Sequence, residues 1–426
     1  MNSRKPTLLE PTRSLSRGFT LIELLVAIVA GLVVSMAAFA LSKQSTRFFH
    51  EETRLANAQF ETLIGFERLR ADVGRAGYLS TPNIQTEPFH CRVSDSDRWP
   101  YGLRALGAVR IAATPAHERS TANGRSPDRI FLTGSYTTDE LFPVRAIIAG
   151  GEASGDQIFL NASFGPMRRL MSRTMVGVDT SEVPEDQVST VVATAVLEDI
   201  FATGRAIRVL DQAGTISFGI IQNASVSGGN PRIVLDARTR LPFVSAGGTS
   251  CGIAGNETGA QLSVLNWIRY QLEPRTGRAE FPGDEGALQL VRRELDFRSE
   301  TADAGLFIGA PEVVADFVVD LKFGLTHVAV GSSPLNPLLN TLAVGDTGVP
   351  NVARDVTTSG ATRGPEHIRS IRARFSTRSR QADRQVGLGT AVGDVLYRYE
   401  VAPDMFARVR TVTADIQLPN LAEVAW

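Results

Sequence analysis

The chain has 426 residues and a formal net charge of −1, and it is long enough to bury a large core in one big domain or two. No lysine- or arginine-rich stripe stands out, which argues against nucleic acid as the main partner. The two cysteines are too few for a disulfide-rich scaffold, and their spacing is not that of a metal site.

Residues 1–18 form a short, polar and basic leader. An apolar run from Phe19 to Leu41 follows, about 35 Å long as a helix and therefore able to span a bilayer. Basic residues before a span keep that side in the cytoplasm and send the rest across. With no second long apolar run, we expect a single-pass protein with nearly all its mass outside the cytoplasm.

Glu23 is the one charged residue inside this apolar run. A carboxylate at membrane depth is costly, so it should have a partner. Cleavage after Gly18 would free the amine of Phe19, which lies four positions before Glu23. An amine and a carboxylate attract strongly in a low dielectric, and each is costly alone.

These residues resemble the type III signal of type IV prepilins and related pseudopilins. The resemblance implies that a prepilin peptidase cuts after Gly18 and methylates the amine of Phe19. It also implies that Glu23 pairs with the Phe19 amine of a neighbouring subunit during filament assembly. The alternative is an ordinary secretory signal cut after Ala38-Phe39-Ala40, which would release a soluble protein beginning at Leu41.

The helical pattern continues past the apolar run. Residues 42–75 lack proline, and Gly74 and Gly77 mark the exit. We expect one helix over about 20–75, with a transmembrane half at 19–41 and an amphipathic half at 42–77. Its second half should pack on the following domain through a stripe formed by Phe48, Leu55, Leu63, Phe66, Leu69 and Val73.

Beyond Tyr78, short β-rich runs alternate with clusters of glycine, proline, serine, asparagine and aspartate. We expect an α+β protein in which residues 78–426 form a large, strand-rich globular domain, with a break into two lobes near 247–259. The long segment 331–367 is predicted to be a mobile or protein-contacting insertion. Candidate strands are 129–133, 157–161, 206–210, 216–221, 232–235, 262–272, 288–295, 313–325, 368–376, 396–401 and 407–418.

Several later blocks resemble PilW-type minor pilins. The residues from Arg68 to Tyr78 are similar to the helix exit of that family, and further blocks follow in the same order. The resemblance implies a pilin-like domain with antiparallel sheets, and it does not extend to residues 85–260 or 331–366. The further blocks are 264–272 with 290–293, 311–323, 371–374 and 406–411.

Cys91 and Cys251 form an even pair in a chain predicted to reach an oxidising compartment. Such a pair can persist as a disulfide, and we expect this one to do so. The alternative is two unpaired, buried thiols.

Signals for catalysis or metal binding are weak. Ser250 lies in a G-x-S-x-G pattern, but no helical pattern follows it, so we expect a flexible loop rather than a nucleophile elbow. The acidic segments 95–97 and 179–186 lack the alternating order of an EF-hand loop, and the five histidines show no metal-site spacing. We therefore expect no catalytic residues, cofactor or metal.

Together these features favour a minor pilin, a structural component or assembly primer of a type IV pilus, placed near the tip because the domain is large. Expected partners are the prepilin peptidase, other pilin subunits and a tip adhesin, with roles in adhesion and motility. A large tip pseudopilin of a type II secretion system is the first alternative. An anchored or secreted hydrolase or adhesin is the second.

Overall fold

In the computed structural model the chain divides into two compact units, 1–56 and 57–426. The described residues are 19–91, 98–113, 123–151, 154–163, 165–172, 187–242, 251–253, 259–275, 286–301, 305–329, 336–358, 364–382, 391–392, 395–396, 398–403 and 405–422.

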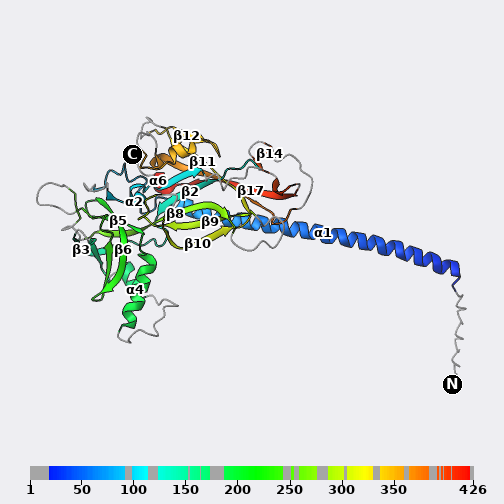
Figure 1. Ribbon diagram of the computed structural model, residues 1–426, viewed down its shortest axis with the longest axis horizontal. Coiled ribbons are helices and arrows are strands. Elements are labelled where there is room, and N and C mark those ends of the chain that lie inside the picture. The colour runs from blue at the N-terminus through cyan, green and yellow to red at the C-terminus, as the bar shows by residue number, and fades with distance from the viewer. Residues whose placement is uncertain are drawn as a thin grey trace, which may run out of the picture. The chain divides into compact units, whose positions relative to one another are not determined.

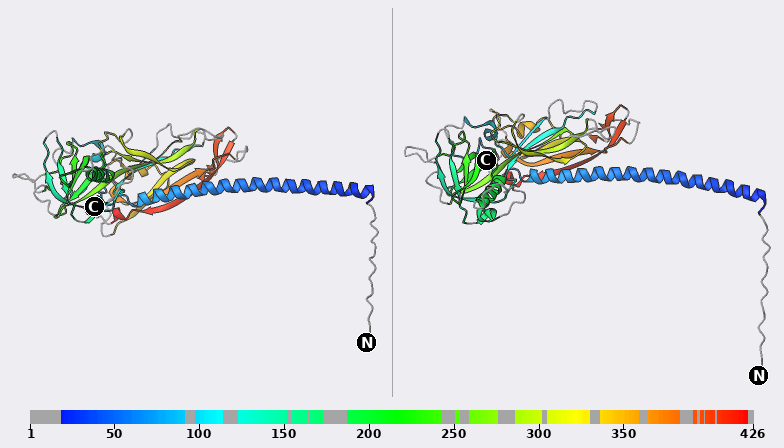
Figure 2. Two further views of the ribbon diagram at one scale, coloured as in Figure 1. Left: turned by 90° about the horizontal axis from the view of Figure 1, so that it is seen from below. Right: turned by 60° about the horizontal axis from the view of Figure 1, so that its bottom comes forward.

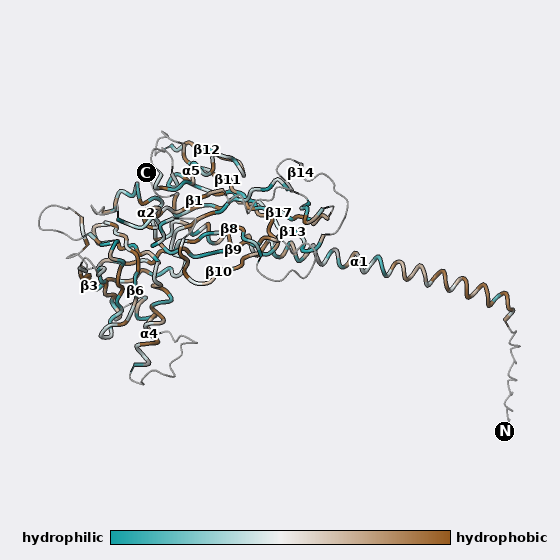
Figure 3. Tube along the Cα trace, viewed as in Figure 1, coloured by the Kyte–Doolittle hydropathy of each residue, from teal (hydrophilic) through white to brown (hydrophobic). Residues whose placement is uncertain are grey.

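Helix α1 runs from Leu21 to Gly74, which confirms the single long helix predicted from the proline-free pattern (Figure 1). Its hydrophobic residues are concentrated in the first half (Figure 3). Its last turns, from residue 57 onward, belong to the strand-rich unit. Gly77 follows with a φ of 78°, a left-handed conformation that suits glycine at a helix exit.

The buried stripe of these last turns consists of Ala58, Thr62, Phe66, Leu69 and Val73. The prediction was wrong for Leu63, whose side chain is 54% exposed. Thr62 takes the inward position instead, because its hydroxyl donates to the Ala58 carbonyl at 2.6 Å and also pairs with a threonine of the sheet. Of the other predicted members, Phe48 lies in the first unit and the side chain of Leu55 lies outside the described residues.

The larger sheet has ten antiparallel strands, and β9 lies between β8 and β10 while the rest follow the order β1-β2-β8-β3-β4-β7-β6-β5. Gln261 of β8 pairs with β3 on one edge and with β5 on the other, so six strands close into a ring. The strands are β1 (Val109–Ala113), β2 (Asp128–Gly134), β3 (Phe142–Ile148), β4 (Gln157–Leu160), β5 (Ala206–Leu210), β6 (Ile216–Ser227), β7 (Asn230–Leu235), β8 (Gln261–Pro274), β9 (Leu288–Leu295) and β10 (Phe307–Ala315).

The smaller sheet has five antiparallel strands in the order β12-β11-β13-β17-β16. Helix α1 and both sheets share one hydrophobic core, in which Phe66 and Leu69 of the helix meet Tyr270 and Phe375 of the strands. The strands are β11 (Val318–Val328), β12 (Leu339–Leu342), β13 (Ile368–Arg378), β16 (Arg398–Ala402) and β17 (Met405–Gln417), and β14 (Ala391–Val392) pairs with β15 (Val395–Leu396) in a separate hairpin.

The remaining described elements are short helices. Helix α4 packs against β6 of the ring through Val196, Leu197 and Ile200, and Figure 2 shows it beside these strands from two sides. The helices are α2 (Tyr101–Arg104), α3 (Gly165–Met171), α4 (Val188–Ile200), α5 (Val349–Val352) and α6 (Pro419–Ala422), with a 3-10 turn, η3, at Pro365–His367.

These elements confirm the predicted fold class, a long apolar N-terminal helix followed by a strand-rich domain with antiparallel sheets. The proposed division near 247–259 falls mostly outside the described residues and stays a prediction. Strand β8 contributes to more than one hydrophobic core. Leu262 and Val264 belong to the main core of the ring, and Ile268 and Leu272 belong to the core that α1 shares with the two sheets.

One predicted strand, 313–325, is in fact two, β10 and β11, because Phe317 between them has a φ of 54°. Its carbonyl accepts a hydrogen bond from the Arg378 N–H at 2.9 Å. The guanidinium groups of Arg275 and Arg378 lie 5.4 and 5.1 Å from its ring. These contacts hold a bulky residue in a left-handed conformation that few such residues adopt.

Candidate functional site at the amino-terminal helix

The N-terminus of α1 is closed by three reciprocal hydrogen bonds between Thr20 and Glu23. The Glu23 carboxylate accepts from the Thr20 backbone N–H and from the Thr20 hydroxyl, both at 3.0 Å, while the Glu23 N–H donates to that hydroxyl oxygen at 3.3 Å. This is a capping box, which satisfies N–H groups that a helix start leaves without partners. Glu23 therefore has an intramolecular role in the single chain.

Phe19 directly precedes this cap and is 84% exposed. Gly18, the residue before the predicted cleavage point, lies outside the described residues, as does the rest of the leader 1–18. The structure therefore places the predicted docking pair, Phe19 and Glu23, within one helix start and leaves the cleavage point undescribed.

The stretch Leu21–His50 is long and apolar enough to cross a membrane. Large side chains are exposed along it, with Leu24 at 56% and Phe39 at 73%. A helix that is apolar all round is stable in a bilayer or among other apolar helices, and not alone in water. Residues 21–41 of the predicted span 19–41 lie in this stretch.

A second group of polar residues fixes the other end of α1 to the sheet. The Asp72 side chain is 6% exposed and accepts hydrogen bonds from Arg292 Nε at 2.7 Å and the Tyr270 hydroxyl at 2.8 Å. Burial, together with the negative charge of Asp72, raises the pKa of Tyr270 well above its usual value, so the phenol stays a neutral donor. Tyr136 also donates its hydroxyl proton to the Asp72 carbonyl at 3.1 Å.

Sequence reasoning did not identify the roles of these residues, although Asp72 and Arg292 both lie in blocks that carry the pilin resemblance. The signal that could have found them is a carboxylate next to the buried stripe position Val73. A charge beside a buried stripe position requires a partner on the facing sheet.

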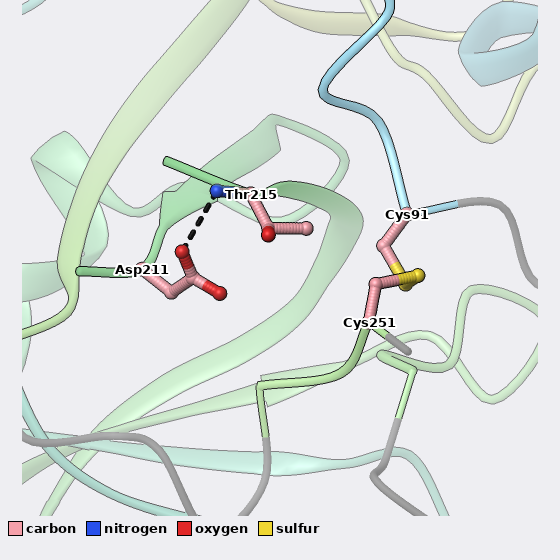
Figure 4. The surroundings of a disulfide bond; sticks show 4 residues. All are labelled: Cys91, Asp211, Thr215 and Cys251. Carbon is pink, nitrogen blue, oxygen red and sulfur yellow. Dashed lines mark hydrogen bonds between the residues drawn. A yellow bond between two sulfur atoms is a disulfide. The ribbon is translucent and has the colours of Figure 1, made fainter. Parts of the chain in front are cut away.

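Cys91 and Cys251 form the predicted disulfide, with their Cα atoms 5.7 Å apart. The Cys91 N–H donates to the Ile216 carbonyl of β6 at 2.9 Å. Figure 4 shows the bond beside the β5–β6 turn, where Asp211 Oδ1 accepts from the Thr215 N–H at 2.7 Å. The disulfide thus ties residue 251 to the segment that lines the start of β6.

The structure does not place the remaining sequence candidates. Ser250 and the acidic segments 95–97 and 179–186 lie outside the described residues. Within the described ranges, no three histidine, cysteine, aspartate or glutamate side chains gather as metal ligands would.

This geometry defines a class of protein in which one apolar N-terminal helix with a capped carboxylate carries a strand-rich domain. Residues 13–39 match the family described as the prokaryotic N-terminal methylation motif. The chain therefore carries a signal like that of type IV pilins and pseudopilins, with Gly18, Phe19 and Glu23 inside the matched segment. No curated protein and no solved structure matches the chain.

Proposed function

We propose that this protein is a minor pilin, a structural subunit or assembly primer of a type IV pilus placed near the tip. The observation that carries the proposal is the methylation motif at 13–39, continuous with an apolar helix that needs a bilayer or other helices around it. The large domain supports the tip position, since such bulk fits poorly into a repeating thin shaft. The PilW-type resemblance of the later blocks supports the choice of a minor pilin.

In this proposal the protein is a substrate of the prepilin peptidase and is not itself an enzyme. It waits in the inner membrane with its domain in the periplasm and then joins other pilin subunits, with a tip adhesin as a further partner. While it waits, the Thr20–Glu23 cap gives the carboxylate hydrogen-bond partners within its own helix. On assembly, the Phe19 amine of a neighbouring subunit would supply a charged partner.

The first prediction concerns processing. The mature chain is expected to begin with an N-methylated Phe19, because Gly18 ends the basic leader and lies inside the matched segment 13–39. Mass spectrometry of the N-terminal peptide from membrane-extracted protein measures this directly. A chain that begins at Leu41 would instead establish ordinary secretion and overturn the proposal.

The second prediction concerns assembly. Replacing Glu23 with alanine should leave membrane insertion intact, because it removes a charge from the span at a gain of a few kcal/mol. Surface pili should nevertheless fall several-fold in a strain that lacks the wild-type copy, because the Phe19 amine loses its partner. Pilus counts and membrane fractionation are the two measurements.

Glu23→Gln is the matched control, since glutamine can keep the capping box but carries no charge. It should lose assembly as Glu23→Ala does. Wild-type piliation by the glutamine variant would show that the cap, and not the intermolecular ion pair, is what assembly needs.

The alternative is a large tip pseudopilin of a type II secretion system, because the same N-terminal motif serves both machines. Genes for pilus assembly and a large tip adhesin beside this gene favour the pilus. A run of secretion-channel genes favours the pseudopilin. A deletion strain that loses pili but still secretes its exoproteins would support the first.

A further inference from the structure

Lysine is nearly absent from this chain. Of 44 lysine and arginine residues, only Lys5, Lys43 and Lys322 are lysines, so Lys322 is the single lysine beyond the first half of α1. Arginine is the better residue for a buried ion pair, since its planar group binds a carboxylate through two hydrogen bonds. An amine, unlike a guanidinium, can lose its proton when buried and act as a nucleophile. The use of lysine at this one position therefore needs a chemical reason.

Lys322 lies on β11 of the smaller sheet and meets Asp128, the first residue of β2 in the larger sheet. Its Nζ is 2.7 Å from Asp128 Oδ1, and the two side chains are only 19% and 10% exposed. The Phe323 N–H points at the other carboxylate oxygen, Oδ2, at 3.4 Å. One oxygen thus faces the amine while the other faces a backbone donor, the kind of donor that stabilises an oxyanion.

A second carboxylate, Asp320, lies two residues before Lys322, so both side chains are on the same face of β11. Asp320 is 1% exposed. Its Oδ2 accepts from Arg374 Nε at 2.9 Å, while its Oδ1 is buried with no hydrogen-bond partner among the described residues. Burial raises the pKa of Asp320 despite the lowering effect of Arg374, and it raises that of Asp128 despite Lys322. Both groups therefore take up a proton more readily than an exposed aspartate.

We propose that Lys322 and Asp128 condense into an intramolecular amide bond that covalently joins the two sheets, with Asp320 moving the protons. The ammonium first gives one proton to Asp128 Oδ1, which leaves a neutral amine beside a neutral carboxyl group. The amine lone pair attacks Asp128 Cγ, and the carbonyl electron pair moves to Oδ2 opposite the Phe323 N–H. Asp320 takes the surplus proton from the nitrogen and returns it to Oδ1. The Cγ–Oδ1 bond breaks, one water leaves, and Asp320 ends as it began.

The reaction needs no co-reactant, because an ammonium and a carboxylate give an amide and water. Burial favours it, since a neutral amide avoids the desolvation cost of two buried charges. The fold holds the reacting groups together, which converts an otherwise slow condensation into an intramolecular step. The inference rests on these contacts alone and is independent of pilus assembly.

The test is the mass of the full chain, extracted from membranes in detergent and reduced at its disulfide. The measured mass of the wild-type protein should be lower, by the mass of one water, than the mass calculated from its processed sequence. After trypsin digestion, residues 126–129 should be joined to residues 299–354, because an amide-linked Lys322 is no longer cut. Wild-type protein at its full mass, with an ordinary peptide ending at Lys322, would overturn the proposal and leave a buried ion pair.

Three variants make the result specific. Lys322→Arg keeps the positive charge and should abolish both the mass loss and the joined peptide. Asp320→Asn should also abolish them, although it keeps both reacting groups, and Asp320→Glu should restore at least part of the product. Formation of the Cys91–Cys251 disulfide and resistance to protease show that each variant has folded. A fully joined peptide in folded Asp320→Asn would overturn the role of Asp320.

Discussion

Replacing both Cys91 and Cys251 with serine should lower the free energy of unfolding by as much as about 5 kcal/mol. The disulfide links residues 160 positions apart, so its loss releases a very long loop in the unfolded chain. The chain-entropy argument sets this figure as an upper value, because an unfolded chain keeps some structure. Urea unfolding of the detergent-extracted protein, followed by the fluorescence of the buried Trp99 and Trp267, measures the change.

Chemical reduction of the wild-type protein is the control, and it should reproduce the stability of the double variant. A peptide map under non-reducing conditions should show residues 91 and 251 in one linked pair. Two thiols that react with an alkylating reagent in the folded wild-type protein would contradict the bond.

Replacing Asp72 with alanine is expected to cost up to about 3–5 kcal/mol, because it removes the buried partner of Arg292 and leaves that charge only the more exposed Glu312, 3.3 Å away. The variant also removes the acceptor of the Tyr270 hydroxyl, and Tyr270 is fully buried. The last turns of α1 should then separate from β8 and β9 before the rest of the domain unfolds. Hydrogen exchange of residues 62–74 measures this local opening, and urea unfolding measures the total loss.

Arg70→Ala is the matched control on the same helix. Arg70 pairs with Glu67 at 3.2 Å, but both side chains are more than half exposed. Exposed pairs of this kind contribute less than about 1 kcal/mol, so the control should be close to wild type. Equal losses in the two variants would mean that Asp72 acts only through general helix stability.

The sequence predicted strands best where apolar and polar residues alternate or form a continuous buried run. Strands β5 and β9 coincide with their predicted ranges, and most of β8 lies within its own. Helix α4 was not predicted, because its sequence is rich in valine and threonine, which favour strands when propensity alone decides. Packing against β6 determines its conformation instead.

Strand order could not be read from the sequence. The ring depends on Gln261 pairing with Pro143 and Leu210, two residues distant from it and from each other along the chain. Periodicity indicates which residues of a strand face a core, but it does not indicate which strand lies next to it in the sheet. The stripe on α1 shows a related limit, since hydrophobicity favoured Leu63 while side-chain hydrogen bonding places Thr62 inside.

For the candidate site, too, the sequence identified some of the residues and missed others. The sequence singled out Phe19 and Glu23, because a charge inside an apolar run is visible without knowledge of the fold. Thr20 was not singled out, although its spacing from Glu23 is that of a capping box. Asp72 and Lys322 need partners more than 190 positions away, and only the fold brings those partners within reach.

The pairing of β2 with β8 has an evolutionary consequence. Ile130 of β2 lies opposite Tyr270 of β8, and Gly134 lies opposite Asn266, so the chain leaves the β2–β8 ladder at residue 134 and returns beside its own exit. Everything in between, including most of the ring, is an excursion whose two ends meet. Such a segment can be lengthened, exchanged or reduced to a short turn without disturbing the neighbouring ladder. Relatives of this protein could therefore share the helix and the two sheets it packs on while carrying quite different modules at this point, and the Cys91–Cys251 bond would then act as the clasp of one particular module.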